Sequence, residues 1–317
     1  MLDPDSVEIL MATCNGDRFV EEQVTSILTQ THANLCLRIR DDASDDHTPD
    51  LLRQLHAQAP ERIILDPPSE HREGAAVNFG TLLDRASARY IMFADQDDVW
   101  LPDKVSRTLA FMRELEAEHG RHTPVLVHTD LRVVGEQLEP IASSLWTYQH
   151  LMPERFTSLN RLLIQNGLTG CTVMINAALA TRCMGGVPRR AIMHDWWIAL
   201  VAAAFGVVTF LPEATLLYRQ HSADETGAKN WSLPDILRPA AATFFSDDIP
   251  VSLGKTYDQA QEFIERYGDF LAPEKLDVVS AYVELPNQNW IQRRQSIFRH
   301  GFLKADLVRS LALLLRV

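Results

Sequence analysis

Residues 90–98 read YIMFADQDD, an almost uniformly apolar run followed at once by carboxylates. The apolar residues predict a buried strand, and an aspartate cluster (Asp95, Asp97 and Asp98) begins directly after it. Carboxylates this close raise one another's pKa unless a cation binds them. Two interpretations follow: an acidic turn that caps the next helix, or a site for a hard divalent cation with oxygen ligands.

The first two hundred residues alternate between strand and helix patterns. Strands are predicted over residues 7–13, 35–40, 62–66 and 90–95, and helices over residues 17–30, 48–58 and 75–88. This alternation predicts an α/β fold with a mainly parallel sheet flanked by helices on both faces. Ligands bind such sheets beyond the carboxyl ends of the strands, where this chain places Thr13, Asp41, Asp42 and the aspartate cluster.

From about residue 125 the pattern is mixed. Strands are predicted over residues 125–134, 171–175, 207–211 and 215–221, and helices over residues 154–164 and 195–205. After Asp224 the composition shifts to polar residues and helix formers. Residues 225–317 are therefore predicted to be a helical appendage to a first domain of residues 1–224.

Composition narrows the class of protein. A hydrophobic content of 46% in 317 residues is enough for a packed core, and a net charge of −12 argues against a nucleic-acid binder. The four cysteines are scattered without a Cys-x-x-Cys pair, which is typical of a reducing compartment and gives no zinc signature. The N-terminus lacks the pattern of a signal peptide, and no apolar run is long enough to span a membrane, so a cytoplasmic protein is expected.

The C-terminal residues 290–317 differ in charge from the rest of the chain. They contain six basic residues against one acidic residue, and their apolar residues recur close to helical spacing. Such a basic amphipathic helix can lie on the anionic inner face of a cell membrane, as a peripheral contact. Alternatively, it can dock on its own domain.

Several segments, in this order along the chain, resemble the motifs of a known enzyme family. They are ATCNG (12–16), RDDASDD (40–46), ADQDDVW (94–100), NGLTGCTVMIN (166–176), HDWW (194–197) and YRQH (218–221). Together they resemble family 2 glycosyltransferases with the GT-A fold, in the DQDD form common among bacterial rhamnosyltransferase-like members. The resemblance covers about residues 7–222 and implies a GT-A type nucleotide-binding sheet.

The resemblance also implies the reaction: inverting, metal-dependent transfer of a sugar from a nucleotide diphosphate. The implied donor is a UDP- or dTDP-sugar, with dTDP-L-rhamnose suggested by the subgroup. The implied acceptor is a saccharide or lipid-linked saccharide in bacterial surface polysaccharide synthesis. An aspartate can accept a hydrogen bond from the imide N–H of uracil or thymine, which cytosine lacks. The residues implied at the donor are Thr13, Cys14, Asn15, Asp41, Asp42, Arg72, Asn78, Asp95, Gln96 and Arg219.

Two positions depart from the family pattern. Cys14 stands where most members have Tyr, so stacking by that ring is not expected here. Ala43 replaces the common Gly, so the backbone at residue 43 need not be left-handed.

Asp97 is the predicted direct ligand of a Mg²⁺ or Mn²⁺ ion, with Asp95 in support and His221 in the metal shell. Bound there, the ion would act as a Lewis acid on the leaving diphosphate. Asp98 is instead expected to orient neighbours or to cap a helix.

Asp195 is the predicted general base, which takes the proton of the attacking hydroxyl. His194 is the alternative base, and the two residues together also suit a helix N-terminus. The predicted acceptor residues are Asn166, Thr169, Gly170 and Trp196. One of the paired residues Trp196 and Trp197 is expected in the core.

Three other classes of protein remain open from the sequence. A nucleotidyltransferase of sugar phosphates also uses aspartates and Mg²⁺, but ATCNGDR (12–18) is a poor phosphate loop. A glycoside hydrolase needs paired carboxylates without a metal or nucleotide. A non-catalytic membrane-associated scaffold with the same fold would be expected to lose Asp97 and Asp195, and this chain has both.

Overall fold

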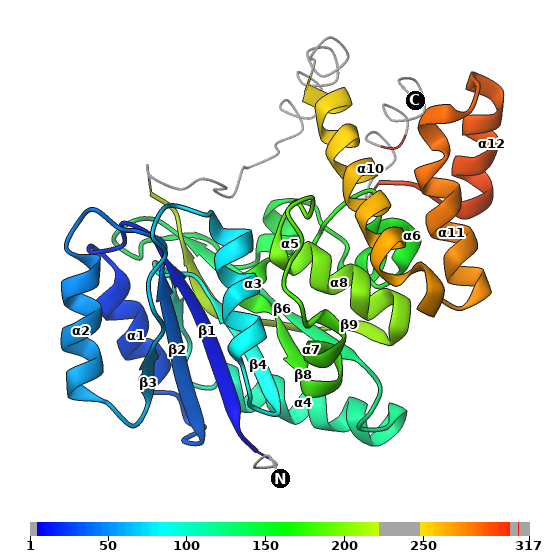
Figure 1. Cartoon of the computed structure of the whole chain (residues 1–317). Helices are drawn as coiled ribbons and strands as arrows, with labels where there is room; N and C mark the ends of the chain where they lie inside the picture. Colours follow the sequence, from blue (N-terminus) through cyan, green and yellow to red (C-terminus); the bar gives the residue numbers. More distant parts are fainter. Residues whose placement is uncertain (1–4, 222–247, 305–309, 311–317) are drawn as a thin grey trace.

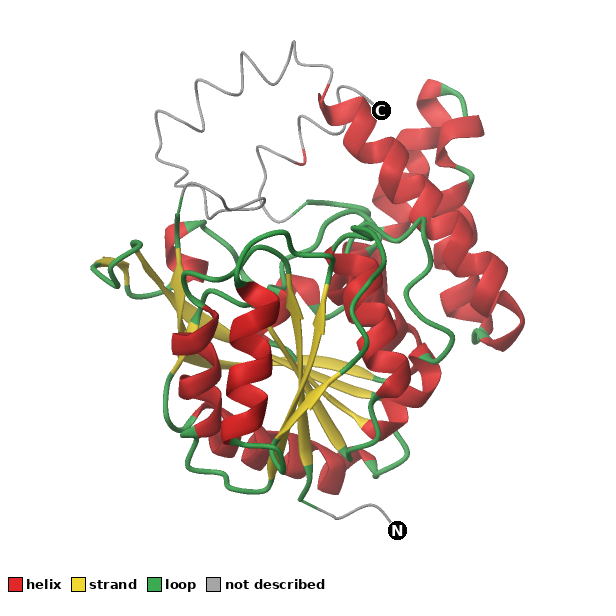
Figure 2. Ribbon diagram, turned by 60° about the vertical axis from the view of Figure 1, so that its left-hand side comes forward, coloured by secondary structure: helices red, strands yellow, loops and turns green. Residues whose placement is uncertain are grey.

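The computed structural model describes residues 5–221, 248–304 and 310. Its centre is a nine-stranded sheet with the strand order β3-β2-β1-β4-β8-β6-β9-β5, and β7 pairs with β6. Helices cover both faces of this sheet (Figure 1, Figure 2). The α/β class predicted from the sequence is therefore confirmed.

One half of the sheet is parallel. It consists of β3 (Ile63–Leu65), β2 (Leu35–Asp41), β1 (Val7–Thr13) and β4 (Tyr90–Ala94). Thr13 is level with Asp41 and Met11 with Ala94, so the carboxyl ends of the three central strands lie at one edge. This register brings together the loops that follow β1, β2 and β4.

Alternate residues of the strands feed two hydrophobic clusters, one on each face, because successive strand side chains point to opposite faces. Ile9 belongs to the cluster with α1 (Val20–Leu28), α2 (Thr48–Gln58) and α4 (Lys104–His119). Leu10 belongs to the cluster with α3 (Ala75–Arg85) and α8 (His194–Phe205). The site loops are thus held on a strand edge that is packed from both sides.

The other half of the sheet is mixed. Its strands are β8 (Met174–Asn176), antiparallel to β4 and β6 (Val125–Val134); β9 (Val207–Arg219), parallel to β6; β5 (Val99–Trp100), antiparallel to β9; and β7 (Pro140–Ala142), antiparallel to β6. The continuous run of parallel strands therefore ends at β4, and β6 and β9 form a further parallel pair.

Two predicted boundaries in this half are wrong. Residues 207–211 and 215–221 do not form two strands, since the single strand β9 spans the first range and ends at Arg219 within the second. Its register against β6 shifts so that Leu211 and Ala214 pair with consecutive residues, which accommodates Pro212 and Glu213. The strand expected over residues 171–175 begins later, because η2 (Gly170–Thr172) is a turn of 3-10 helix that leads into β8.

Short elements connect the larger ones: α5 (Leu145–Tyr148), η1 (Pro153–Phe156), α6 (Leu159–Leu162), α7 (Ala177–Cys183), η3 (Gly268–Phe270) and η4 (Leu285–Asn287). The helix predicted over residues 154–164 is divided between η1 and α6. Ser158 separates the two elements, and its backbone is extended, with φ −123° and ψ 144°.

Three C-terminal helices, α10 (Asp248–Tyr267), α11 (Pro273–Val283) and α12 (Trp290–His300), pack beside α6 and α8 (Figure 1). The rings of Phe263 and Tyr267 lie 5.5 and 6.0 Å from that of Trp197, which is fully buried as one of the paired tryptophans was expected to be. The appendage thus shares a hydrophobic cluster with the sheet. The predicted boundary between residues 224 and 225 lies outside the described residues.

Candidate active site

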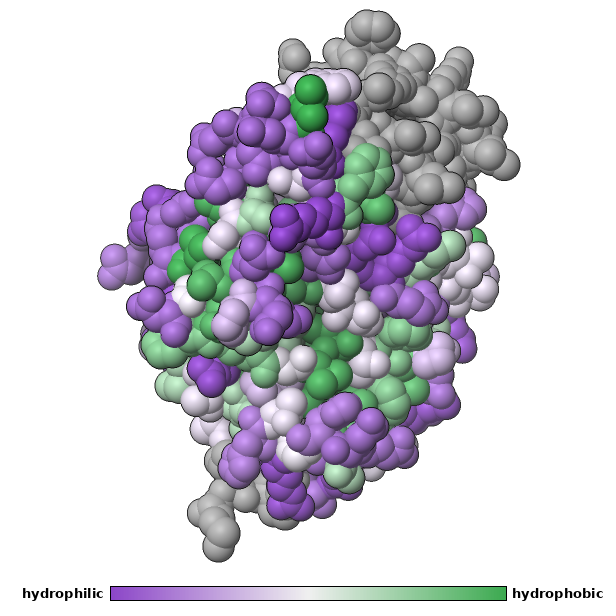
Figure 3. Space-filling model, turned by 90° about the vertical axis from the view of Figure 1, so that its right-hand side faces the viewer, coloured by the Kyte–Doolittle hydropathy of each residue, from purple (hydrophilic) through white to green (hydrophobic). Residues whose placement is uncertain are grey.

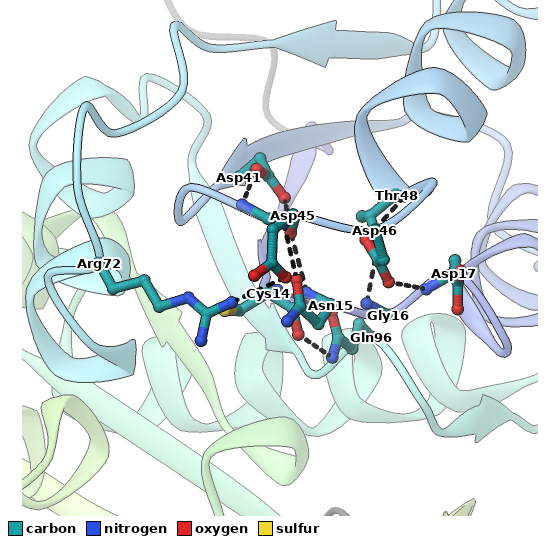
Figure 4. A network of polar contacts seen from close by, with 11 residues as sticks. Cys14, Asn15, Gly16, Asp17, Asp41, Asp45, Asp46, Thr48, Arg72 and Gln96 are labelled. Atoms are coloured by element: carbon teal, nitrogen blue, oxygen red, sulfur yellow. Dashed lines mark hydrogen bonds and ion pairs between the residues drawn. The ribbon is translucent and has the colours of Figure 1, made fainter.

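The loop after β1 is held by side chains from the loops after β2 and β4 (Figure 4). The amide of Gln96 accepts from the Cys14 N–H at 2.8 Å and donates to the Cys14 carbonyl at 2.9 Å. A Cβ at Gly16 would lie 2.2 Å from Gln96 Oε1, so a larger residue there would displace the Gln96 amide from this contact. The predicted donor residues Cys14 and Gln96, 82 positions apart, are therefore joined by direct hydrogen bonds.

Asp41 organises the turn after β2. Its carboxylate accepts hydrogen bonds from the Thr13 hydroxyl at 2.9 Å and from the backbone and hydroxyl of Ser44 at 2.9 and 2.6 Å. Ser44 Oγ in turn accepts from the N–H of Asn15. Asp41 thus joins the ends of β1 and β2 at the predicted nucleotide site.

The expectation for Ala43 is wrong. Its φ is +53°, and Asn15 on the facing loop has φ +51°. A left-handed backbone is costly for Ala, which has a Cβ and no side-chain hydrogen bond to offset the strain. The hydrogen bonds that the Asp41 carboxylate accepts from the N–H and the hydroxyl of Ser44 hold the turn in this conformation.

Asp42 and Asn78 have different partners from Asp41. The Asp42 carboxylate accepts from the backbone N–H groups of Glu73 and Gly74 at 2.9 and 2.8 Å, which fixes the segment before α3. The Asn78 amide bonds to both the guanidinium and the carbonyl of Arg40. Arg40 also pairs with Glu73 at 2.8 Å, and this hydrogen bond is the main reason why the pKa of Glu73 is lowered. Both predicted donor residues therefore brace the wall of the site.

Arg72 is exposed at the mouth of the same loops. Its guanidinium lies 3.0 Å from Asp45 Oδ1, with half of the side chain accessible (Figure 4). An exposed ion pair of this kind contributes little to stability. Arg72 can therefore exchange Asp45 for an anionic ligand at small cost.

At the end of β4, Asp97 meets a residue 124 positions away. Its Oδ2 lies 2.9 Å from His221 Nε2, and the imidazole packs 4.9 Å from the ring of Phe19. Adjacent ligands around an octahedral ion with bonds of about 2.1 Å lie about 3 Å apart. One carboxylate and one imidazole at this spacing fit a Mn²⁺ or Mg²⁺ ion that takes its other ligands from the substrate and water.

Arg219 is buried next to this pair, with 3% of its side chain exposed. Its guanidinium donates to the backbone carbonyls of Asp97 and Glu136 and pairs with Glu22. These contacts join the end of β9 to the aspartate cluster. They favour a positioning role for Arg219 over the direct donor contact that the resemblance implies.

Asp98 is the fully buried member of the aspartate cluster. Burial, followed by the charges of Asp97 and Asp95, raises the pKa of its carboxyl group, and the Cys171 thiol lies beside it. Among the described residues, Asp95, Asp98 and Cys171 form a second group whose ligand atoms lie within 4.8 Å. A buried thiol is a poor ligand for a hard ion, so Asp97 and His221 are the better candidates to hold one.

Asp195 lies in the first turn of α8 and is 6% exposed. Its Oδ1 accepts from the Trp196 N–H at 2.6 Å and its Oδ2 from the Asn166 amide at 3.2 Å. Burial raises the pKa of Asp195 to about 6, and these hydrogen bonds oppose the shift. A carboxylate with this pKa is ionised at neutral pH and is a stronger base than an ordinary aspartate.

His194 is less suited to act as the base. Its ring is stacked on Phe79 at 4.0 Å, and burial lowers its pKa to about 3. Neither ring nitrogen has a hydrogen-bond partner among the described residues. Gly170 packs against it, because a Cβ at Gly170 would lie 2.9 Å from His194 Nε2. Asp195 is therefore the better candidate for the base, and His194 packs in the apolar floor beneath it.

A cavity of about 410 Å³ opens at Asn166 and Trp196, the two residues that hydrogen-bond to Asp195, although Asp195 itself does not line it. Three of the four predicted acceptor residues, Asn166, Thr169 and Trp196, line it, and Gly170 lies directly behind Asp195. The remaining lining residues are Gln149, Leu151, Ile164, Gln165, Gly167, Leu168 and Lys304. The hydrogen bond from Asn166 to Asp195 links the cavity to the candidate base.

The model of the family described as Glycosyl transferase family 2 matches residues 8–176, more than half of the chain. The chain belongs to glycosyltransferase family 2. The matched range ends at β8 and includes the loops after β1, β2 and β4, which carry predicted donor residues. Membership in this family supersedes the nucleotidyltransferase, glycoside hydrolase and scaffold interpretations.

Curated relatives of this protein are also named as glycosyltransferases. The putative teichuronic acid biosynthesis glycosyltransferase TuaG of Bacillus subtilis is 38% identical over 71% of this chain and 85% of the relative. The dTDP-rhamnosyl transferase RfbG of Shigella flexneri is 25% identical over 69% and 74%. The UDP-Glc:alpha-D-GlcNAc-diphosphoundecaprenol beta-1,3-glucosyltransferase WfgD of Escherichia coli is 33% identical over 56% and 63%.

A solved structure supports the fold assignment. S. aureus TarS 1-349, crystallised in complex with UDP, superposes with a TM-score of 0.56 at 12% identity, over 94% of this chain and 92% of that one. At this identity the similarity concerns the fold alone, and it confirms the GT-A type. Within the described ranges, no helix combines the length and apolar character that crossing a membrane requires.

The sequence did not indicate some residues that shape the site of this glycosyltransferase. Lys104 is fully buried below the aspartate cluster, where burial lowers its pKa to about 8 and its Nζ bonds to Thr215 at 3.2 Å. Its position in LPDKVS gave no sign of burial. Cys171 and Lys304 likewise carry no local sequence signal of their positions.

Proposed function

We propose that this glycosyltransferase moves a sugar, with inversion, from a UDP- or dTDP-sugar to a saccharide or lipid-linked saccharide acceptor in bacterial surface polysaccharide synthesis. The observation that carries the proposal is the position of Asp195. It is a buried carboxylate with a pKa of about 6, tied by Asn166 to a cavity of about 410 Å³. The names of TuaG and WfgD support the polysaccharide role.

Asp195 accepts the proton of the acceptor hydroxyl as that oxygen attacks the anomeric carbon of the donor. One attack from the face opposite the leaving diphosphate inverts the configuration at that carbon. Trp196 N–H and the Asn166 amide hold the carboxylate, so that its orientation is fixed before the acceptor arrives. A pKa of about 6 leaves most of the enzyme with an ionised base at neutral pH.

Asp97 and His221 would hold a Mg²⁺ or Mn²⁺ ion, with Asp95 in support. Bound there, the ion supplies positive charge for the leaving diphosphate, so that no side chain has to protonate it. The short contact between Asp97 and His221 supports this assignment, because the same two atoms can face one ion.

The uracil or thymine ring would lie against the loops after β1 and β2. Thr13, Cys14, Asn15 and Asp41 lie at the ends of these strands. An Asp41 oxygen can accept from the ring imide N–H as a further hydrogen bond. The relatives use different donors, dTDP-rhamnose by the name of RfbG and UDP-glucose by that of WfgD. L-Rhamnose from dTDP-L-rhamnose is the first donor sugar to test.

Peripheral contact with the cytoplasmic face of the membrane is part of the proposal. On α12, Ile297 is buried, and Phe302 just beyond the helix is buried too. Ile291 and Phe298, seven residues apart, share another side of the helix and are 60% and 64% exposed. Figure 3 shows green hydrophobic patches among purple hydrophilic ones on the face that bears the C-terminal helices. The helix thus packs against the rest of the protein with one side and exposes apolar side chains on another. Residues 305–309 and 311–317 lie outside the described residues.

A thermal-shift panel tests the donor assignment. UDP and dTDP with Mn²⁺ should raise the melting temperature by several degrees, because a ligand present at about 100 times its Kd stabilises the fold by about 2.7 kcal/mol. CDP is the matched control, since it has the same diphosphate and lacks the imide N–H. Equal shifts with CDP, or shifts unchanged by EDTA, would contradict the base contact or the metal site, respectively.

A further inference from the structure

We propose that α10 positions the candidate base: Gln259 and Arg266 hold the loop of residues 184–193, which leads into the helix that carries Asp195. The inference rests on the proposed function, because it concerns the base of that same reaction. It assigns a role in the reaction to two residues that lie far beyond the matched family range, which ends at residue 176.

The first turn of α8 is not capped by a side chain. Met193 precedes the helix with an extended backbone, φ −148° and ψ 154°, and makes no side-chain hydrogen bond to the helix end. Asp195 itself accepts from the Trp196 N–H within the same turn. A helix without such a cap lacks one of the contacts that usually fix its first turn. The position of Asp195 therefore depends on how the preceding loop is held.

Gln259 holds the end of this loop. Its Oε1 accepts a hydrogen bond from the N–H of Ile192, three residues before Asp195, at 2.9 Å. Gln259 is 1% exposed, and its Nε2 has no hydrogen-bond partner within the described ranges. A buried amide with an unpaired donor costs stability that an apolar side chain of similar size would not cost. Gln259 therefore contributes to the direction of the backbone at Ile192 more than to the stability of the fold.

Arg266, also on α10, holds the start of the loop. Its guanidinium donates to the carbonyls of Met184 and Gly186 at 2.6 and 2.8 Å. From the other side, Asp84 Oδ1 of α3 accepts from the N–H groups of Gly185 and Gly186, both at 3.0 Å. These two glycines have φ of +93° and +78°, a backbone conformation that residues with a Cβ rarely adopt. The turn is thus fixed through both its carbonyls and its N–H groups.

The loop lies between α3 and α10. On the α3 side, a Cβ at Gly80 would lie 2.9 Å from the backbone nitrogen of Val187, so the two segments are in close contact. On the other side, α10 packs on the body of α8, because the ring of Phe263 lies 5.5 Å from that of the fully buried Trp197. α10 therefore contacts both the helix that carries Asp195 and the loop before it. Misplacing a reacting group by about 1 Å can lower a rate about 10²-fold.

A double-mutant cycle measures the effect of α10 on Asp195 without a substrate. Asp195→Asn is introduced into the full-length wild type and into Gln259→Leu, which keeps the size of the side chain and removes its unpaired amide. Urea unfolding between pH 4.5 and pH 8 then gives the apparent pKa of Asp195 in each background. This pKa should fall from about 6 toward its ordinary value, by about half a pH unit or more, because a loosened first turn lets water reach the carboxylate. Arg266→Met should have the same effect through a separate contact.

Gln261→Leu is the matched control, because it makes the same substitution on the same helix, where Gln261 bonds to Glu265 at 2.9 Å. It should leave the pKa of Asp195 unchanged. Hydrogen exchange followed by mass spectrometry reports on the loop itself. In Gln259→Leu, peptides that cover residues 184–196 should exchange about 5-fold faster than in the wild type or the control, because the closed loop has lost one hydrogen bond.

Each outcome supports or overturns the inference. An unchanged or raised pKa of Asp195 in both α10 variants overturns it even where stability falls, because a purely structural contact affects stability alone. An equal fall in Gln261→Leu also overturns it. A fall with only one of the two substitutions assigns the positioning to that residue alone.

The transfer rate links the inference to catalysis. Gln259→Leu should transfer sugar about 10-fold more slowly, with a Kd for UDP and Mn²⁺ within about twofold of the wild type. A wild-type rate together with a lowered pKa would overturn the role in catalysis. If Asp195→Asn transfers sugar at the wild-type rate, the proposed function fails, whereas the cycle still shows whether α10 positions the carboxylate.

Discussion

Replacing Asp195 with Asn removes a carboxyl group that is 6% exposed and whose pKa burial raises from 3.8 to about 6. The folded state binds this proton more tightly than the unfolded state does. The stabilising contribution of the protonated group is therefore complete below about pH 4 and is lost as the pH rises through about 6. Above that pH the ionised group costs the wild type about 3 kcal/mol, from a shift of about two pKa units at about 1.36 kcal/mol each.

The asparagine side chain of the variant carries no such cost, but its hydrogen bonds fit less well. Both Trp196 N–H and the Asn166 amide donate to Asp195, and an amide has only one acceptor oxygen. The variant should lose about 1 kcal/mol for this mismatch at every pH. At pH 8 the net gain in free energy of unfolding should be about 2 kcal/mol, which falls to about zero near pH 4.5.

Urea unfolding of both proteins between pH 4.5 and pH 8 measures this difference. The change with pH isolates ionisation, because the hydrogen-bond mismatch does not depend on pH. Asp46→Asn is the control of opposite sign: although partial burial opposes the shift, hydrogen bonds from Thr48 and Asp17 lower the pKa of Asp46, so that variant should lose stability at pH 8. A constant difference between wild type and Asp195→Asn across this range would refute the burial argument. So would an ordinary pKa near 4 in the pH dependence of kcat/KM.

The remaining predictions concern packing around the site and the C-terminal helix. Gly170→Ala should lower stability and activity together, since its Cβ would lie 2.9 Å from the buried His194 ring; a variant with wild-type melting temperature and rate would show that the turn relaxes freely. Ile297→Ala should cost about 2–4 kcal/mol in urea unfolding, whereas Phe298→Ala should change stability by less than about 0.5 kcal/mol. In liposome flotation the same Phe298→Ala variant should bind anionic vesicles more weakly, and unchanged flotation would remove the case for membrane contact by α12.

The donor side was the most predictable part from the sequence. Strand patterns followed by polar loops fix where Thr13, Asp41 and Asp97 come in the chain, and parallel pairing then brings the loops together. This inference needs only the order of elements and the rule that carboxyl ends share an edge. It holds because β1, β2 and β4 are neighbours in register.

Other features depend on tertiary contacts that no local pattern shows. The left-handed backbone at Ala43 is imposed by Asp41 and Ser44, whereas local preference would oppose it. The Asp97–His221 contact joins residues 124 positions apart, and only the motif resemblance suggested it. Lys304 lines the cavity because the segment after α12 folds back over α6, an arrangement that depends on packing among the C-terminal helices.

The central claim is that Asp195 takes the acceptor proton in a reaction that other residues prepare by binding the donor. The most direct test compares the transfer rate at saturating donor, and the Kd of UDP with Mn²⁺, for wild type and Asp195→Asn. The account predicts a rate lower by about 10²–10⁴, with a Kd within about twofold. A variant that transfers sugar at close to the wild-type rate would contradict it.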